Sequence, residues 1–166
     1  MKTDNLLYQN SRFEVRGKDG DGLYLHEYRP HYVTVLAISD GNLVVVRQFR
    51  APVEGDTFEL PGGRTEGDET LEEAARRELR EETGLIAGVL HPMGAVDSHA
   101  CMLNRQVHFY FTDEILSSEA QDLDDDEDID VLFVPLADAF EHIRRNEWKD
   151  TELLSALLLA KLHGHL

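Results

Sequence analysis

The chain has 166 residues, 42% of them hydrophobic, and its 16 lysines and arginines against 33 acidic residues give a net charge of −17 at pH 7. This length and apolar content suit one domain with a full core. The acidity excludes a simple binder of nucleic acid or anionic membranes, because the chain would repel such a surface unless a cation came between them.

The first third of the chain has the alternating or apolar runs that are typical of strands. Strands are predicted at residues 12–16, 23–28, 32–38 and 43–49. Between the last two, Ser39-Asp40-Gly41-Asn42 predicts a hairpin turn.

The remainder mixes helices with strands. A helix is predicted at residues 71–82, further strands at 89–96, 105–112 and 129–134, and two closing helices at 136–145 and 151–163. In the last helix an apolar stripe is predicted from Leu153, Leu154, Leu157, Leu158 and Leu162. Because strands and helices do not alternate strictly, we expect an α/β or α+β sandwich with a mixed sheet, built as a single domain over residues 1–166.

The cysteine content and hydropathy bear on the compartment. Cys101 is the single cysteine, so no internal disulfide can form. The N-terminal residues lack the apolar core of a signal peptide, and no apolar run approaches the length of a membrane span. We therefore expect a cytoplasmic protein with no membrane partner.

Two glutamates of the helix predicted at residues 71–82 fall on its apolar face. Advancing about 100° per residue from Leu71 places Ala74, Ala75 and Leu79 on one apolar arc around Leu71, and Glu78 and Glu82 fall inside this arc. Two like charges on a half-buried face lose hydration and repel, so they should either take up protons or bind a cation. A hard divalent metal ion would compensate both the lost hydration and the repulsion. The alternative interpretation is a surface helix whose glutamates form ion pairs.

The spacing of residues in and before this helix is that of a known family. Gly63, Glu69 and the run RELREETGL at residues 77–85 match every fixed position of the Nudix box, so the chain resembles a Nudix hydrolase. The similarity to the branch of ADP-ribose and nucleoside-diphosphate-sugar pyrophosphatases extends to residues 46–50, 59–63 and 126–129.

This resemblance implies an architecture. It implies a Nudix-type α/β/α sandwich with a mixed sheet, in which residues 31–166 form the catalytic core. Residues 1–30 would form an N-terminal extension of antiparallel strands, which this branch uses to build a homodimer.

The resemblance also implies Mg²⁺ as the cofactor, with Mn²⁺ as a substitute. Glu78 and Glu82 match the principal metal ligands, and the carbonyl of Gly62 matches a backbone ligand. Arg77 would tie Glu69 to the helix and so hold loop and helix in one geometry.

Candidates for the general base lie in or near an acidic loop, which we define as residues 121–129. A run of acids is normally a solvated loop, but in the branch resembled this loop supplies a further carboxylate and the general base. Glu127 matches the metal ligand or base, and Asp125 is the competing candidate. Glu81 is the third catalytic candidate, as a further ligand or as the residue that orients water.

Arginine offers forked donors for phosphate. The resemblance favours Arg29 and Arg50 as substrate contacts, with Glu59 as a ribose or base partner. Arg105 is a further substrate candidate, and Arg47 and Arg64 belong to the same set of arginines. The alternative for each is an ordinary ion pair in an acidic protein.

The activity implied is Mg²⁺-dependent hydrolysis of the pyrophosphate bond of a nucleoside diphosphate linked to a sugar. The substrate would be ADP-ribose or an ADP- or GDP-sugar, and the products would be a nucleoside monophosphate and a sugar phosphate. Residues 98–104 lack a proline that many ADP-ribose members carry, which favours the other sugars.

Two other functions are weighed against this one. The first is a pyrophosphohydrolase of nucleoside triphosphates or RNA 5′ ends, and the acidic composition counts against RNA. The second is a non-catalytic nucleotide sensor, against which the intact box glutamates count.

Overall fold

A mixed central sheet organises the structure, a computed structural model that describes residues 5–17, 22–124 and 127–166. Its strands are β4 (His31–Ser39), β5 (Asn42–Arg50), β6 (Gly55–Glu59), β7 (Gly62–Arg64), β9 (His91–Asp97), β10 (Gln106–Thr112) and β12 (Ile129–Pro135). Their order is β12-β5-β4-β10-β9, with β6 beside β5 and β7 beside β4. β10 runs parallel to β4, whereas the other pairs are antiparallel.

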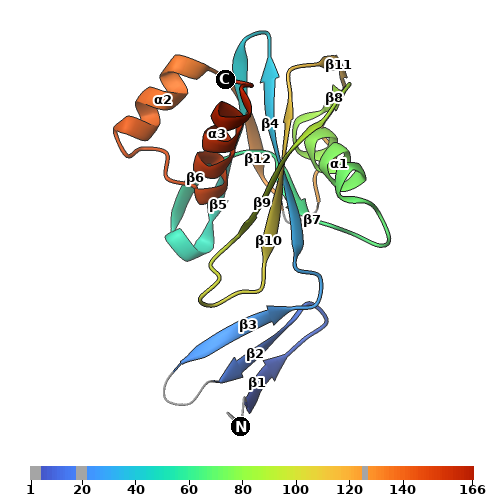
Figure 1. Cartoon of the computed structure of the whole chain (residues 1–166), viewed down its shortest axis with the longest axis vertical. Coiled ribbons are helices and arrows are strands. Elements are labelled where there is room, and N and C mark those ends of the chain that lie inside the picture. The colour runs from blue at the N-terminus through green and yellow to red at the C-terminus, as the bar shows by residue number, and fades with distance from the viewer. Residues whose placement is uncertain (1–4, 18–21, 125–126) are drawn as a thin grey trace.

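Helices cover both faces of this sheet (Figure 1). α1 (Leu71–Thr83) packs on one face against a cluster that includes Val33, Val35 and Val44. α2 (Leu136–Arg144) and α3 (Thr151–His163) pack on the other, against a cluster that includes Leu36 and Val45. The result is the α/β/α sandwich with a mixed sheet that the sequence predicts.

Local signals determine both ends of α1. Thr70 caps its N-terminus in a reciprocal capping box with Glu73, an arrangement that stabilises a helix by roughly 1 kcal/mol. Gly84 ends it with a positive φ of 73°, which a residue with a side chain rarely adopts. Leu79 is fully buried beneath the helix and contributes roughly 2 kcal/mol of hydrophobic stabilisation.

The leucine stripe predicted for α3 is only partly buried. Leu153 and Leu157 lie in the core, whereas Leu154, Leu158 and Leu162 are exposed. At about 100° per residue the five leucines spread over half the circumference of the helix, which is too wide for one face. Two small residues, Ala156 and Ala160, complete the buried face instead.

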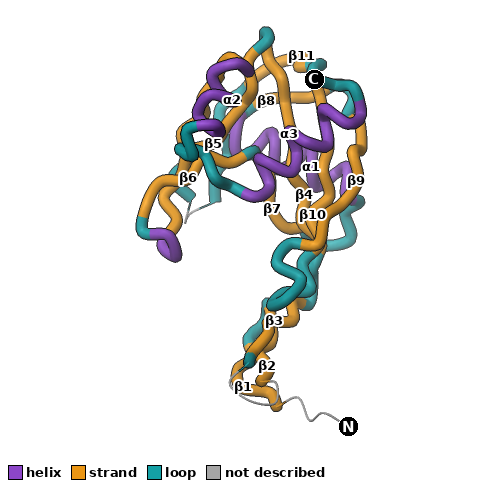
Figure 2. The backbone as a smooth tube through the Cα atoms, turned by 60° about the vertical axis from the view of Figure 1, so that its left-hand side comes forward, coloured by secondary structure: helices purple, strands orange, loops and turns teal. Residues whose placement is uncertain are grey.

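A second sheet of three antiparallel strands extends from one end of the body (Figures 1 and 2). It consists of β1 (Asn5–Gln9), β2 (Phe13–Gly17) and β3 (Leu23–Glu27). The Leu25 amide donates to the Met102 carbonyl at 2.8 Å, and the Asn104 side chain bonds both backbone groups of Glu27. The predicted strands β2 and β3 are confirmed, whereas β1 was not predicted.

The predicted hairpin joins β4 to β5 through Asp40 and Gly41, both with positive φ. Two short strands, β8 (Leu85–Ala87) and β11 (Ile115–Ser118), pair beside α1, and a short 3₁₀ helix (Ala51–Val53) precedes β6. In the described part of the chain, no helix has both the length and the hydropathy needed to span a membrane.

Candidate active site

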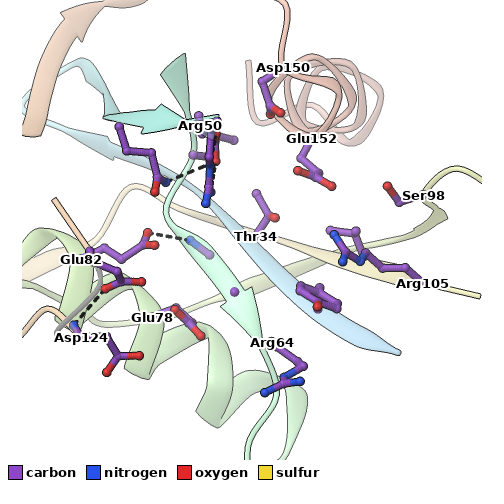
Figure 3. Close-up of a pocket in the computed structure, with 18 of the residues that line it drawn as sticks. Thr34, Arg50, Arg64, Glu78, Glu82, Ser98, Arg105, Asp124, Asp150 and Glu152 are labelled. Carbon is purple, nitrogen blue, oxygen red and sulfur yellow. Dashed lines mark hydrogen bonds and ion pairs between the residues drawn. The ribbon is translucent and has the colours of Figure 1, made fainter. Parts of the chain in front are cut away.

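A cavity of about 1050 Å³ opens on the central sheet. α1, β7 and the acidic loop line one side of it, and β5, β6 and the start of α3 line the other. Figure 3 shows Glu78, Glu82 and Asp124 on the first side and Asp150 and Glu152 across from them. Acidic side chains outnumber arginines in this lining, so the cavity repels an anionic ligand unless bound cations neutralise the carboxylates.

Glu78 and Glu82 lie on the buried face of α1, as the helical wheel predicts, and are only 8% and 4% exposed. Burial raises the pKa of Glu78 to about 7, although the charge of Arg77 opposes the shift. Burial also raises the pKa of Glu82 well above its ordinary value, against the opposing hydrogen bond from the Gly62 amide. Both side chains therefore hold a charge that their surroundings do not fully stabilise.

Two glycines bring β7 against these carboxylates. The Gly62 amide donates to Glu82 Oε2 at 2.9 Å. A Cβ at Gly63 would lie 2.4 Å from Glu78 Oε1, and one at Gly62 would lie 2.2 Å from the Val33 carbonyl oxygen. A side chain at Gly62 would therefore collide with the main chain, and one at Gly63 would displace the Glu78 carboxylate, which explains the Gly-Gly pair.

Arg77 joins the loop before α1 to the helix. Its guanidinium donates to both carboxylate oxygens of Glu69, at 2.8 and 3.1 Å. It also donates to Glu78 at 2.9 Å, to Glu81 at 3.0 Å and to the backbone carbonyl of Arg64 at 3.1 Å. The predicted link between Arg77 and Glu69 is therefore present. The same guanidinium also holds Glu78, a candidate metal ligand, and Glu81, a candidate catalytic residue.

The start of the acidic loop is fastened to the C-terminal end of α1. The Asp122 amide donates to the Glu81 carbonyl at 2.9 Å. The Gln121 side chain donates to the Glu82 carbonyl at 2.6 Å and to the Ile129 carbonyl at 3.2 Å. Gln121 thus ties both ends of the loop to the helix that carries the buried glutamates.

Glu127 lines the cavity, and its negative charge acts on both Glu78 and Glu82. Its own carboxylate accepts a hydrogen bond from the Asp124 amide at 3.1 Å. The competing candidate, Asp125, lies outside the described residues. Glu81 also lines the cavity, with its carboxylate held by Arg77 and by Arg80 at 2.9 Å.

The donor set fits a hard divalent cation. Carboxylate oxygens are the ligands that Mg²⁺ prefers, and the buried charge of Glu78 and Glu82 would be neutralised by it. As they lie, Glu78 turns to Arg77 and Glu82 to the Gly62 amide. Among the described residues no three His, Cys, Asp or Glu side chains form a group that could hold a metal ion.

Arg50 and Glu59, both predicted to contact substrate, line the cavity and pair with each other. Arg50 donates two forked hydrogen bonds to Glu59, at 2.9 and 2.6 Å, and Thr57 donates a third at 2.5 Å. Burial raises the pKa of Glu59, but these hydrogen bonds outweigh burial and leave it below its ordinary value. Glu59 therefore keeps its charge and neutralises Arg50.

Arg105, a further predicted substrate residue, also lines the cavity and is similarly paired. It donates to both oxygens of Glu27, at 3.0 and 2.7 Å, across 78 residues of sequence. Its guanidinium lies 4.0 Å from the ring centroid of Tyr32, whose hydroxyl donates to Glu27 at 3.1 Å. The contacts of Glu27 and Tyr32 with Arg105 were not predicted, because no local pattern in the sequence indicates a partner so far along the chain.

Arg29 does not lie with the other candidates in the described structure. It donates to the Gly67 carbonyl at 2.9 Å, in the loop before α1, and it does not line the cavity. Its contact therefore supports the loop between β7 and α1, and a role in binding substrate is left as a prediction only.

Two acidic residues at the start of α3, Asp150 and Glu152, were not singled out from the sequence. Asp150 caps the helix by accepting from the Leu153 amide at 2.7 Å. Burial, and then the charges of Asp150 and Glu59, raise the pKa of Glu152 to about 7. The Asp-Thr-Glu start of a helix signals a cap in the sequence, but nothing local signals that it faces this cavity.

Comparison with known proteins agrees with this geometry. The NUDIX domain profile matches residues 28–157. The chain is 35% identical over 135 residues to an ADP-ribose pyrophosphatase of Bacillus subtilis (strain 168), covering 80% of this chain and 73% of that one. It is 28% identical to a GDP-mannose pyrophosphatase of Citrobacter koseri (strain ATCC BAA-895 / CDC 4225-83 / SGSC4696), covering 98% and 91% of the two chains.

A solved structure described as an ADP compounds hydrolase has the same fold. It superimposes with a TM-score of 0.82 and 20% identity, over 98% of this chain and 93% of that one. The profile covers most of this chain, including the buried glutamates of α1 and the glycines of β7. The chain therefore belongs to the NUDIX family, and it is a Nudix hydrolase, a pyrophosphatase that acts on phosphoanhydrides.

Proposed function

We propose that this Nudix hydrolase splits the pyrophosphate bond of a nucleoside diphosphate linked to a sugar, releasing a nucleoside monophosphate and a sugar phosphate. One observation carries the proposal: Glu78 and Glu82 are buried side by side against β7, at the edge of a cavity of about 1050 Å³. That volume suits a ligand larger than a simple phosphate. Relatives named ADP-ribose pyrophosphatase and GDP-mannose pyrophosphatase support this substrate class.

Glu78 and Glu82 would hold Mg²⁺ together with the carbonyl of Gly62, and Glu127 is the further ligand. When bound there, Mg²⁺ supplies neutralisation of phosphoryl charge and a more acidic water. Arg77 holds Glu78 and Glu81 in place, so the helix presents its carboxylates in one arrangement.

A carboxylate of this region would accept the proton of the attacking water. Glu127 is our first candidate, because it lines the cavity and its charge reaches both buried glutamates. Glu81 is fixed by Arg77 and Arg80 and would orient the water. Asp125 remains the competing base on sequence grounds.

The opposite wall would receive the rest of the substrate. Arg50 is paired with Glu59, and Arg105 with Glu27, so both pairs present polar edges with little net charge. Such edges suit the hydroxyl groups of a sugar and the polar edge of a base.

The test is a product assay with Mg²⁺ across ADP-ribose, ADP-glucose, GDP-mannose and a set of nucleoside triphosphates, repeated with Glu82→Gln. We expect monophosphate and sugar phosphate from at least one diphosphate sugar. In Glu82→Gln we expect kcat to fall at least about 100-fold, because the variant loses a buried ligand charge. Turnover of triphosphates alone would reject the sugar assignment, and unchanged turnover in Glu82→Gln would reject the metal assignment.

We also propose that the protein is a cytoplasmic homodimer formed through the N-terminal sheet. Apolar side chains of β1 are exposed, with Leu6 at 51%, Leu7 at 60% and Tyr8 at 55%. Exposed apolar side chains that lie together are typical of an interface. The single cysteine, Cys101, fits a reducing compartment.

A further inference from the structure

The arginines that line the cavity differ in whether a carboxylate already neutralises their charge. Arg50 pairs with Glu59, Arg77 pairs with Glu69, and Arg105 pairs with Glu27 through two hydrogen bonds each. The charge that they can offer to a phosphate is reduced by these carboxylates. The arginines of the lining are Arg12, Arg50, Arg64, Arg77 and Arg105.

Arg64 is different. Its side chain makes no hydrogen bond or ion pair with any residue in the described ranges. Its backbone is nevertheless held firmly, because its carbonyl accepts a hydrogen bond from Arg77 at 3.1 Å and it ends a strand that pairs with β4. A fixed backbone with an unpaired, half-buried cation is the arrangement expected of a ligand-binding residue.

The register of β7 directs this side chain into the cavity. Arg64 lies opposite Tyr32 on β4, and directly paired residues of antiparallel strands share a face. The charge of Arg64 acts on both Tyr32 and Glu27, which belong to the cavity wall beside Arg105. Figure 3 shows Arg64 between Glu78 and Arg105.

Gly63, the residue before Arg64, lets β7 and therefore Arg64 lie close to the carboxylates of α1. Gly63 points the opposite way along the strand, and only its lack of a side chain leaves room for Glu78. Arg64 is thus one residue from the backbone that touches Glu78. Arg12, the other cavity arginine whose side chain has no partner among the described residues, lies in the turn between β1 and β2 instead.

We propose that Arg64 binds the diphosphate group of the substrate, with its forked N–H donors on the phosphate oxygens. Planar guanidinium groups suit this geometry, whereas an ammonium offers only a point charge. The inference rests on the proposed function, since it assigns a residue to the substrate class proposed above. It also identifies which arginine supplies net positive charge at a wall where the other pairs are neutralised.

The experiment compares Arg64→Lys and Arg64→Gln with the wild type in the presence of Mg²⁺. Steady-state KM and kcat are measured with the best diphosphate sugar. Titration calorimetry then measures Kd for the non-hydrolysable α,β-methylene analogue of ADP-ribose, and separately for inorganic pyrophosphate. Arg144→Gln is the matched control, because it removes the same charge from an exposed pair with Glu141 on α2.

We expect KM and both Kd values to rise about 10- to 100-fold in Arg64→Gln, because a charge-assisted forked contact is lost. In Arg64→Lys the rise should be smaller, with kcat within about threefold of the wild type in both variants, as for a contact made equally before and during reaction. Thermal unfolding checks that both variants fold, and Arg64→Lys keeps the test open if Arg64→Gln does not.

Unchanged Kd and KM in Arg64→Gln would overturn the inference, as would a fall in kcat with KM unchanged. A rise in Kd in Arg12→Gln without a rise in Arg64→Gln would also overturn the inference, because diphosphate binding would then belong to Arg12. These outcomes differ from failure of the proposed function, in which the wild type hydrolyses no diphosphate sugar. In that case pyrophosphate binding by Arg64→Gln still decides whether Arg64 holds a diphosphate.

Discussion

Gly63 shows how one missing side chain can shape the site. The residue lies on β7 with its Cα directed at the Glu78 carboxylate, and a methyl group there would come within 2.4 Å of Oε1. The atom it meets is the end of a flexible side chain. Glu78 would therefore turn away while the strand keeps its place.

We predict that Gly63→Ala lowers kcat about 10- to 100-fold, because a carboxylate displaced by about 1 Å is costly to catalysis. The melting temperature should change little. Gly55→Ala is the control, since its Cβ would meet only the Val53 carbonyl oxygen, at 3.8 Å. Wild-type activity in Gly63→Ala, or a loss fully explained by unfolding, would contradict this view.

Gly62→Ala should instead destabilise the fold, because its Cβ meets backbone.

At the scale of elements, α1 and α3 each bring carboxylates to the cavity from opposite sides. α1 is fixed by its cap, by Arg77 and by the Gln121 contact with the acidic loop. Asp150 caps the start of α3 with its side chain, whereas Glu152 faces the cavity as the second residue of the helix. Burial and the nearby charges of Asp150 and Glu59 explain why Glu152 is difficult to ionise.

The stability of the protein should depend on pH through Glu152. Burial first, then Asp150 and Glu59, raise its pKa to about 7, and the charges of Arg105 and Arg50 oppose the shift. A carboxyl whose pKa is higher in the folded than in the unfolded state destabilises the fold as it ionises. The penalty is absent below the unfolded pKa, near 4.5, grows as pH rises, and is fully present above about 7.

We therefore predict that Glu152→Gln raises the melting temperature at pH 8 by roughly 2–4 °C, as about 1 kcal/mol does in a chain of this size. Near pH 4.5 the difference should vanish. The measurement is calorimetric unfolding across this range with EDTA present. Asp138→Asn is the matched control, an exposed acid in the first turn of α2. An equal gain at both pH values would refute the assignment to ionisation.

Local signals account for what the sequence predicts of the elements. Thr70, the apolar arc and Gly84 define α1 and turn Glu78 and Glu82 inward, and Asp40-Gly41 defines the hairpin. The strands β6 and β7 are short and contain glycine, so they carry little alternation to detect.

Pairings between distant segments explain what the sequence does not predict. The Arg105–Glu27 pair spans 78 residues, and each partner alone looks like an ordinary surface charge. Arg29 donates to the Gly67 carbonyl, 38 residues away, a contact that no local pattern indicates, and its role in binding substrate stays a prediction. On α3, counting leucines without Ala156 and Ala160 misplaces the buried face.

At the scale of the whole molecule, the N-terminal sheet stands apart from the body (Figure 2). Its strand β1 exposes the apolar side chains of Leu6, Leu7 and Tyr8. We predict that light scattering with gel filtration gives twice the 18.9 kDa mass of one chain. Leu6→Asp should weaken this association about tenfold or more, because it places a charge among apolar contacts. Leu116→Asp, at an apolar position of β11 that is 63% exposed, is the control. A monomeric wild type at micromolar concentration would argue against the dimer.

The Arg77 guanidinium makes five positions of the chain behave as one unit. It holds Glu69, Glu78, Glu81 and the main chain of Arg64 at once. Energetic effects of substitutions within such a unit do not add, because the first removal already frees the remaining members. The side chains of Glu69, Arg77, Glu78 and Glu81 therefore depend on one another, and a tolerated single change at one of these four would require compensation at another. Arg64 belongs to the unit only through its main chain, so its side chain can change independently.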